Sequence, residues 1–364
     1  MAALEVTDTK YLEDLKKRVV FPLHIHWDGS IPAEQLFELA TARGKKLFLP
    51  EKDIAGKHII YENPDNRLIH NPAELKSFMT NLRSYSIIDV FSVATELMQT
   101  KDDLVNAAVA HCKYLKSQNT VYAESRFAPQ YHTFSGLSIE QVIKHSIEGF
   151  QKGKDETGVD VSLIVCIGRE TDVESGMQIA KTAINCEKRF PKKIVGIDLA
   201  CEERGNPPEK HYPAFKLTFD SPLKRTIHAG EMCDEITNLH NIVASIYLLR
   251  ADGLGHAMPL YKDKGLIETV RSRRIRVESN PVCNNFFFGT NIEDLHLDEL
   301  VNAGVLVTIN PDDPAMIPNG DLVHNLYHLG KLYGNNFVDK VIRNSVESCW
   351  GLSREEKEKY LKEK

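Results

Sequence analysis

Residues 19–30 are Val-Val-Phe-Pro-Leu-His-Ile-His-Trp-Asp-Gly-Ser, an apolar run followed by two alternating histidines. The apolar run predicts a β-strand, and side chains two residues apart on a strand point to the same face. His24 and His26 therefore project side by side where the strand ends. Neutral imidazole nitrogen is a good ligand for zinc, so this stretch predicts half of a metal site. The rest of the chain has to supply the other ligands.

Beyond residue 118 the pattern of strands and helices alternates regularly. A helix follows each of the further predicted strands, which cover 120–127, 159–167, 194–199, 225–228, 253–256, 275–278 and 305–309. With the strand before His24 these make eight, and eight strand–helix repeats are typical of a (β/α)8 barrel. The strand at 305–309 is continuously apolar, as in a parallel sheet covered on both faces. A doubly wound open sheet gives the same order of elements, so that alternative stays open.

The first two predicted strands are separated by residues 31–119, a longer connection than one crossover helix needs. Apolar positions at helical spacing continue from about 74 to 116 and predict helices there. We expect a helical insertion at about 45–118 that covers the site. Four of its apolar side chains either line this lid or form an ordinary helical core: Phe78, Met79, Leu82 and Tyr85.

Extra helices are expected near both ends of the chain, one capped by Asp8 and two over 320–332 and 335–348. The predicted fold class is therefore α/β, a (β/α)8 barrel forming a single domain over residues 1–364. The run Phe286-Phe287-Phe288 follows the seventh strand and either walls a pocket or anchors a loop.

The composition argues against a nucleic acid or membrane partner. The 364 residues are 42% hydrophobic and 26% charged, with a net charge of -6 and no basic run. No apolar stretch reaches the ~18 residues that span a bilayer, and the N-terminal residues lack a signal-peptide core. The seven cysteines show no CxxC spacing, which predicts free thiols and a reducing, cytoplasmic location.

The active site of a (β/α)8 barrel forms where its strands end. The polar residues at the predicted strand ends are His24, His26, Asp198, Cys201, Glu202, Glu203, His228, Glu231, His256, Asn310, Asp312 and Asp313. A catalytic zinc site needs three or four N/O ligands and an open position for water. One zinc per chain is expected, held by His24, His26, His228 and Asp312.

Two of the unligated residues are placed for proton transfer. Glu231 follows a ligand by three residues and can shuttle a proton, while His256 can hold the attacking hydroxide. Each carboxylate also has a plain alternative. Glu231 could be a carboxylate at a helix N-terminus, and Asp313 a turn residue before Pro314.

These residues fall in motifs that resemble the adenosine deaminase family, in the adenosine/AMP deaminase branch of the amidohydrolase barrels. The resemblance covers about residues 20–350. Its motifs are the HxHxDGS segment at 24–30, Ser125-Arg126-Phe127-Ala128-Pro129, Gly196-Ile197-Asp198-Leu199-Ala200, Arg225-Thr226-Ile227-His228-Ala229-Gly230-Glu231, Gly255-His256 and Asp312-Asp313-Pro314.

The resemblance implies zinc-dependent hydrolytic deamination of adenosine, and of 2′-deoxyadenosine, to the inosine product and ammonia. It implies that Glu231 protonates purine N1, that His256 orients the attacking hydroxide, and that Asp313 binds N7. Asp28 corresponds to a ribose-hydroxyl contact. Deaminases of free purine bases and of nucleotides usually carry Glu or Asn at that position, so Asp28 favours a nucleoside substrate.

The chain departs from the family pattern near the substrate. Cys201 stands where a glycine commonly offers its backbone N–H to purine N3, and its side chain could narrow the pocket. The segment 278–284 departs from the usual Cys-Pro-x-Ser-Asn order, Pro311 replaces Ser or Thr, and Trp27 replaces Leu. None of these departures removes a predicted metal ligand or proton-transfer residue.

Three alternatives therefore stay open. The first is a deaminase of adenine or of another 6-substituted purine nucleoside or nucleotide. The second is a different metal-dependent hydrolase, although Lys192 and Lys193 precede strand four and so do not suit a two-metal site. The third is a barrel that only binds its ligand.

Overall fold

The computed structural model describes residues 4–61 and 63–362. Its strands are β1 (Ile25–His26), β2 (Tyr122–Phe127), β3 (Asp160–Gly168), β4 (Ile194–Ala200), β5 (Lys224–Ala229), β6 (Gly253–His256), β7 (Arg276–Ser279) and β8 (Leu306–Ile309). Its α-helices are α1 (Thr9–Lys16), α2 (Ala33–Ala42), α3 (Pro72–Met79), α4 (Ile87–Glu96), α5 (Lys101–Ser117), α6 (Ile139–Thr157), α7 (Val173–Arg189), α8 (Tyr212–Lys216), α9 (Glu235–Tyr247), α10 (Lys264–Ser272), α11 (Pro281–Phe288), α12 (Leu297–Asn302), α13 (Leu322–Tyr333), α14 (Asn335–Ser348) and α15 (Arg354–Lys362). Short 3-10 helices are η1 (Pro64–Arg67), η2 (Pro129–His132), η3 (Pro208–His211), η4 (Met258–Lys262) and η5 (Glu293–Leu295).

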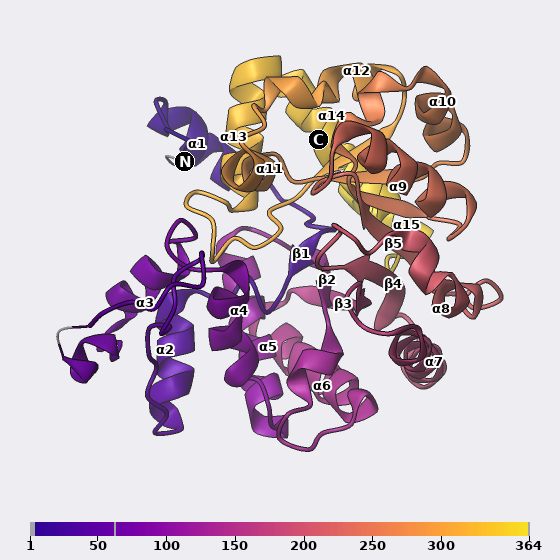
Figure 1. Ribbon diagram of the computed structural model, residues 1–364. Helices are drawn as coiled ribbons and strands as arrows, with labels where there is room; N and C mark the ends of the chain where they lie inside the picture. Colours follow the sequence, from indigo (N-terminus) through magenta and orange to yellow (C-terminus); the bar gives the residue numbers. More distant parts are fainter. Residues whose placement is uncertain (1–3, 62, 363–364) are drawn as a thin grey trace.

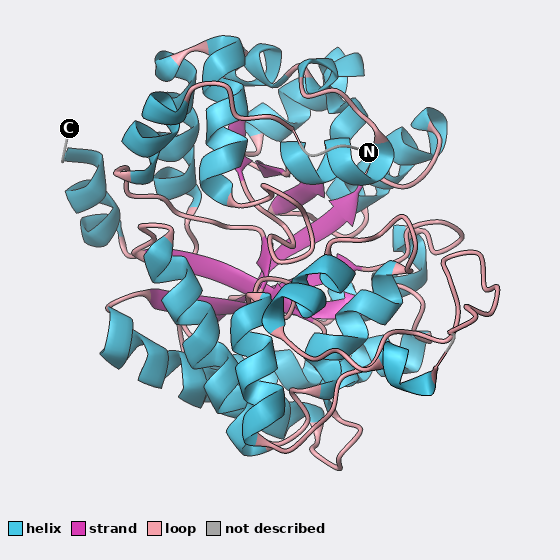
Figure 2. Ribbon diagram, turned by 90° about the vertical axis from the view of Figure 1, so that its left-hand side faces the viewer, coloured by secondary structure: helices cyan, strands magenta, loops and turns pink. Residues whose placement is uncertain are grey.

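The eight strands form one parallel sheet in chain order, from β1 to β8. The sheet closes after β8, where Asp312 forms a parallel bridge with Ile25. The amide of His26 donates to the carbonyl of Asp312 at 3.0 Å, and the amide of Asp312 donates to the carbonyl of His24 at 3.2 Å. This closure confirms the barrel and excludes the doubly wound sheet, whose strand order reverses. Figure 2 shows the strands at the centre with helices around them.

The first strand is shorter and begins later than the apolar run predicts. Within 19–23 only Val20 makes a bridge, to Thr120, and regular pairing is confined to Ile25–His26. Pro22 lies between these two contacts and has no amide hydrogen to donate to a ladder. Its carbonyl still accepts a 3.0 Å hydrogen bond from the amide of Glu124 in β2. The segment therefore runs beside β2 without forming a continuous strand.

The predicted helical insertion divides into α3, α4 and α5. Polar side chains cap the starts of these helices; Thr100, for example, forms a capping box with Asp103 at the start of α5. Helix α5 packs along α6 in the outer ring (Figure 1). A Cβ on Gly149 of α6 would lie only 2.7 Å from the Cβ of Ala108, so glycine permits this close packing. Helix α5 therefore belongs to the ring of helices around the barrel, and the inserted segment proper ends before it.

The apolar side chains considered for a lid pack as core. Phe78 and Met79 are buried in the main core, and Leu82 and Tyr85 pack half-buried against it. The rings of Phe78 and Tyr85 meet edge-on with their centroids 4.9 Å apart. These four residues therefore stabilise the insertion itself.

The Phe286-Phe287-Phe288 run lies on helix α11, which begins directly after β7, whereas the sequence pattern predicts the helix after this strand near 292–302. Phe286 and Phe287 pack against a small cluster formed by Val282, Cys283 and Ile317. The run thus anchors α11 to the loop after β8.

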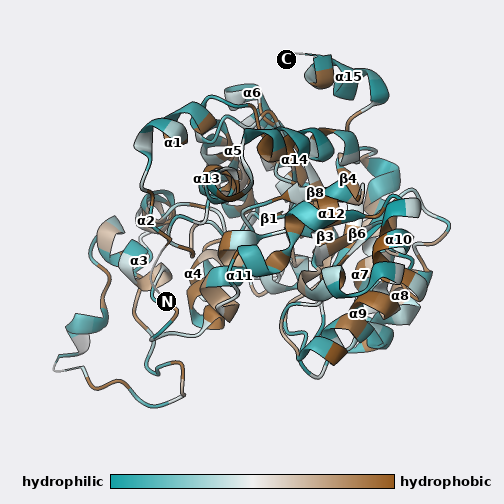
Figure 3. Cartoon of the chain, turned by 90° about the horizontal axis from the view of Figure 1, so that it is seen from above, coloured by the Kyte–Doolittle hydropathy of each residue, from teal (hydrophilic) through white to brown (hydrophobic). Residues whose placement is uncertain are grey.

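Segments from opposite ends of the sequence lie side by side. Helix α1 packs against α13, and the hydroxyl of Tyr327 accepts a 2.8 Å hydrogen bond from the amide of Asp8 (Figure 1). Asp8 also caps α1 as predicted, because its side chain accepts from the amide of Tyr11. Figure 3 shows hydrophilic and hydrophobic residues alternating around the outer helices. None of the helices over residues 4–61 and 63–362 combines the length and apolar composition of a membrane span.

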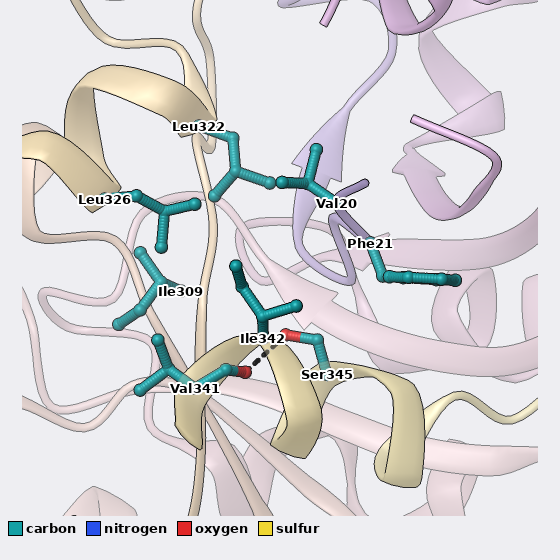
Figure 4. A pocket seen from close by; sticks show the side chains of 8 residues that line it. All are labelled: Val20, Phe21, Ile309, Leu322, Leu326, Val341, Ile342 and Ser345. Atoms are coloured by element: carbon teal, nitrogen blue, oxygen red, sulfur yellow. Dashed lines mark hydrogen bonds between the residues drawn. The ribbon is translucent and has the colours of Figure 1, made fainter. Parts of the chain in front are cut away.

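A small cavity of about 10 Å³ lies between the segment before β1, β8, α13 and α14 (Figure 4). Its only polar side chain, Ser345, donates to the carbonyl of Val341 at 3.1 Å. A space of this size holds at most about one water, which would need two or more free polar partners. We therefore assign this cavity to packing.

Candidate active site

Three histidines and one aspartate meet at the C-terminal edge of the barrel strands. They come from the first strand, β5 and the residues after β8: His24, His26, His228 and Asp312. One possible ligand atom from each lies within 4.8 Å of the others. His26 Nε2 is 3.2 Å from His228 Nε2, and His24 Nε2 is 3.1 Å from Asp312 Oδ1. The structure thus brings together the four residues predicted as metal ligands.

Buried carboxylates orient two of these imidazoles. His24 Nδ1 donates to Glu278 Oε2 at 2.9 Å, and His228 Nδ1 donates to Asp198 Oδ1 at 3.2 Å. A carboxylate can only accept, so the proton of each ring sits on Nδ1. The Nε2 atom of each ring keeps its lone pair and faces the other donors, as in many metal sites.

The donor set fits a metal ion. His24 Nε2 and Asp312 Oδ1 lie 3.1 Å apart, but neither atom carries a proton, so both are buried without a hydrogen bond, which costs ~1–3 kcal/mol per atom unless a ligand binds them. Burial lowers the pKa of His26 to about 3 and that of His228 to about 4. Both rings are therefore neutral near pH 7, the form that binds a metal.

Glu231 and His256 form a buried pair beside the donor set. Glu231 Oε2 lies 3.1 Å from His256 Nε2, and His256 Nδ1 donates to Asn284 Oδ1 at 2.7 Å. Burial, reinforced by the charges of Glu203 and Asp312 and opposed by His256, raises the pKa of Glu231 to about 7. A carboxyl with this pKa is half protonated at neutral pH, which suits a general acid.

The loop that carries Glu231 is held by the buried carboxylate of Glu203. Glu203 accepts hydrogen bonds of 2.9, 3.0 and 3.1 Å from the amides of Gly230, Glu231 and Met232, and one of 2.8 Å from Asn241. Helix α9 begins four residues after Glu231 and has its own cap. The alternative assignment of Glu231 to a helix N-terminus is therefore wrong.

Asp28 and Asp313 are buried carboxyls on either side of Gly29. A Cβ on Gly29 would lie 1.9 Å from Asp313 Oδ1, so this close approach requires glycine. The Oδ1 atom of each aspartate has no hydrogen-bond partner, while Asp28 Oδ2 is 3.4 Å from His132 Nε2. Burial and then the charge of Asp312 raise the pKa of Asp313 well above its ordinary value. Both carboxyls therefore have free oxygens for polar groups of a ligand.

Cys201 follows β4 with φ of 73°, in the left-handed region that favours glycine. His256 and Asp312 also lie there, each with φ of 61°. Backbone strain of this kind clusters at functional sites. The Cys201 side chain packs half-buried near Ala128 and Tyr131, and burial raises the pKa of its thiol well above the ordinary value. Cys201 thus presents a neutral thiol at the rim.

Several residues of the site received no role from the sequence. Arg126 donates to Asp198 at 2.9 Å and to Glu278 at 2.7 Å, and so joins the two carboxylates behind the histidines. The thiol of Cys283 donates to Asp312 Oδ2 at 2.9 Å. A signal was present for Arg126 and Glu278, because a charged side chain within a buried strand needs a partner. Nothing in the sequence indicates the contact of Cys283 with Asp312, because a buried cysteine needs no charged partner.

The whole chain resembles known deaminases in sequence. The adenosine deaminase family profile matches residues 21–363. An adenosine deaminase from Clostridium kluyveri is 30% identical over 345 residues, which cover 94% of this chain and 92% of that protein. An adenine deaminase from Geotalea uraniireducens is 30% identical over 294 residues, which cover 80% of this chain and 75% of that protein.

The fold is also that of known structures. An amidohydrolase from Burkholderia ambifaria, solved with bound Zn, shares it with a TM-score of 0.76 and 17% identity, covering 99% of this chain and 93% of that one. Fold and site together define a (β/α)8 barrel with a candidate metal site where its strands end. Within that class, the chain belongs to the adenosine deaminase family.

Proposed function

We propose that this protein is a zinc-dependent enzyme that hydrolyses adenosine and 2′-deoxyadenosine, releasing ammonia and the corresponding inosine. The observation that carries this proposal is the buried Glu231 carboxyl, 3.1 Å from His256 and next to three histidines and an aspartate. Family membership supports a hydrolytic deaminase, and the relatives include both adenosine and adenine deaminases.

The donors His24, His26, His228 and Asp312 would hold one zinc ion. Bound zinc supplies nucleophilic water at neutral pH, because it lowers the pKa of water from about 15.7 to roughly 7. A set of three imidazoles and one carboxylate suits zinc, and the related barrel solved with bound Zn supports this choice.

The chain's own residues would handle the protons. Glu231 would donate a proton to purine N1, which makes the neighbouring C6 more open to attack by water. His256, 3.1 Å from Glu231 and 3.6 Å from Asp312 Oδ2, would hold the attacking water by a hydrogen bond. The C6–N bond then breaks, and the amino group takes up a proton and leaves as ammonia. Water is the only other reactant.

The buried carboxyls on either side of Gly29 would orient the purine nucleoside. The free Oδ1 of Asp313 would bind purine N7, and the free Oδ1 of Asp28 would accept from a ribose hydroxyl. The backbone N–H of Cys201 would meet purine N3. These contacts would hold a nucleoside both at its base and at its sugar. Binding energy from the sugar can then help to orient the reacting base.

The charges near Asp28 argue against a nucleotide. Among the described residues, the only basic group within ion-pair distance of Asp28 is His132. Arg169, which is also buried, donates to the carbonyls of His228 and Asn206. A phosphate placed beside Asp28 would therefore meet a negative charge without a free cation to balance it.

Competing substrates test the proposal directly. The purified protein, loaded with zinc, is given adenosine, 2′-deoxyadenosine, adenine and AMP at equal concentration, and ultraviolet absorbance follows the loss of the 6-amino purine. Adenosine is expected to react fastest, and a chelator is expected to stop the reaction. Turnover of adenine about tenfold faster than adenosine would show that the natural substrate is the free base.

We also propose that the enzyme works in the reducing cytoplasm. All seven cysteines are free, which supports this location.

A further inference from the structure

A second cavity lies at the opposite end of the barrel from the candidate active site. It has a volume of about 760 Å³, within the usual range for small-molecule sites. Its walls include the first residues of β5, β7 and β8, together with the loop before β6 and the chain after α14. These are the N-terminal ends of the strands, whereas the metal donors lie at the C-terminal ends. The proposed deamination uses none of the residues of this cavity.

The cavity is basic although the chain as a whole is acidic, with a net charge of -6. Its cationic side chains are Lys224, Arg250, Arg273, Arg274, Arg276 and Lys357. Its acidic side chains are Asp252 and Glu347. Arg276 is already neutralised by buried carboxylates, which leaves five cations against two carboxylates. Gathering like charges around one cavity is unfavourable unless an anion binds there.

The carboxylates do not saturate these cations. Asp252 already pairs with Arg225 at 2.6 Å, outside the cavity lining, and more loosely with Lys224 at 3.4 Å. Among the residues that the structure describes, Arg250 and Arg273 form no ion pair. Instead the Arg250 guanidinium lies 4.1 Å from the ring centre of Phe219. The Arg273 guanidinium lies 4.7 Å from the ring centre of Tyr247. Stacking of this kind holds a guanidinium in place while its N–H edge stays available.

We propose that this cavity binds a small phosphorylated molecule. Phosphate oxygens can be contacted from several sides by the stacked Arg250 and Arg273, and also by Arg274 and Lys224. Guanidinium groups bind phosphate in a bidentate manner. The volume of this open cavity suits a ligand with more than one phosphate group better than a single inorganic ion. Trp350 and Tyr247 add aromatic surface to the same walls.

One buried residue links the cavity to the metal donors. Arg276 lines the cavity and donates to Glu278 Oε1 at 2.7 Å, while Glu278 Oε2 accepts from His24. Its guanidinium also lies 3.4 Å from the ring centre of Trp350. Arg276 belongs to the buried network, so a test of binding has to spare it and change the exposed arginines.

Trp350 provides a local reporter for the test. The chain has two tryptophans; Trp27 is fully buried elsewhere, and Trp350 is half-buried in the wall of the cavity. Zinc-loaded protein is titrated with inorganic pyrophosphate at constant ionic strength, and tryptophan fluorescence and heat of binding are recorded. Saturable binding with a fluorescence change is expected, and the change is expected to disappear in Trp350→Phe while the heat remains.

Matched variants distinguish this cavity from general charge attraction. In Arg250→Ala/Arg273→Ala the affinity for pyrophosphate is expected to fall by roughly tenfold or more per arginine. The variant Arg250→Lys/Arg273→Lys keeps the charge, so its affinity for pyrophosphate is expected to lie between that of the parent and that of the double alanine variant. The control Arg83→Ala/Arg189→Ala removes two exposed arginines elsewhere and is expected to bind like the parent. Absence of saturable binding, or equal affinity in both double alanine variants, would overturn the proposal.

Discussion

Two layers of buried polar groups lie one above the other in the barrel, and they differ in how completely they are paired. The lower layer consists of Arg126, Arg276, Glu124, Asp198 and Glu278. Arg276 bonds Glu124 and Glu278 at 2.5 and 2.7 Å, and Arg126 bonds Asp198 and Glu278. Burial opposes ionisation of Glu278, but the two arginines outweigh it and hold its pKa well below the ordinary value. This layer is charged, and Arg126 Nε is its only buried side-chain N or O atom without a hydrogen-bond partner.

The upper layer contains the metal donors and the proton-transfer pair, and it leaves buried atoms without partners. Free atoms are found on His24, Asp28, Asp312 and Asp313. Three residues at its rim also have left-handed backbone. Closely paired charges stabilise one arrangement of the barrel, whereas free buried atoms bind groups that the chain does not supply. The lower layer therefore positions the upper one, and five changes test this difference.

The largest effect is expected for His24→Ala in the upper layer. Loss of one donor, together with its link to Glu278, should remove the metal and lower activity by roughly three orders of magnitude or more. Metal analysis and adenosine turnover measure both effects. His145→Ala, which changes a histidine paired with Glu148 on α6, serves as control and should keep metal and activity. An active but metal-free His24→Ala protein would exclude the metal mechanism.

Glu231→Gln should lower kcat by roughly 10²–10⁴-fold, because the amide cannot donate a proton as the carboxyl does. The metal content should stay at one per chain, since Glu231 is not among the four donors. Glu209→Gln, at an exposed pair with His240, is the matched control. If most activity survives in Glu231→Gln, another group supplies the proton.

Arg126→Met tests the lower layer. It leaves Asp198 and Glu278 without their shared cation, which should destabilise the fold by about 3–5 kcal/mol. Metal affinity should fall by about 10–100-fold, because both carboxylates orient histidine ligands. Denaturant unfolding and metal titration measure the two effects. Arg354→Met, at an exposed pair on α15, should change neither.

The pH dependence of kcat/KM should report the raised pKa of Glu231. The protonated carboxyl is the active form, so kcat/KM should fall as pH rises through about 7, by about tenfold per unit above it. A profile that rises through this range would assign the acid to a different group.

The smallest effect is expected for Cys201→Gly at the rim. Glycine removes the cost of the left-handed backbone and should stabilise the protein by up to about 1 kcal/mol. Cys186→Gly, in the last turn of α7 and fully buried, should instead destabilise it by roughly 1 kcal/mol or more. Equal changes in the melting temperature of both variants would show that the backbone at Cys201 is not strained.

The sequence by itself determined the repeated strand–helix pattern and the identity of the residues at the strand ends, whereas the closure after β8 decided between the barrel and the doubly wound sheet. Alternating apolar strands and helices predict parallel pairing, and parallel pairing brings strand ends to one edge. That reasoning found His24, His26, His228 and Asp312 as neighbours, although 288 residue positions (312 minus 24) separate the first from the last. It placed the first strand too early, since Pro22 interrupts the pairing that the apolar run suggests.

Only the tertiary structure decided what supports those residues and how they are charged. Arg126 and Glu278 lie within strands from different parts of the chain, and their pairing depends on the closed register of the barrel. The raised pKa of Glu231 likewise depends on burial beside Glu203 and Asp312. The basic cavity depends on loops that meet only after the barrel closes. Residue types follow from the sequence, whereas pairing, burial and charge depend on distances that exist only in the folded chain.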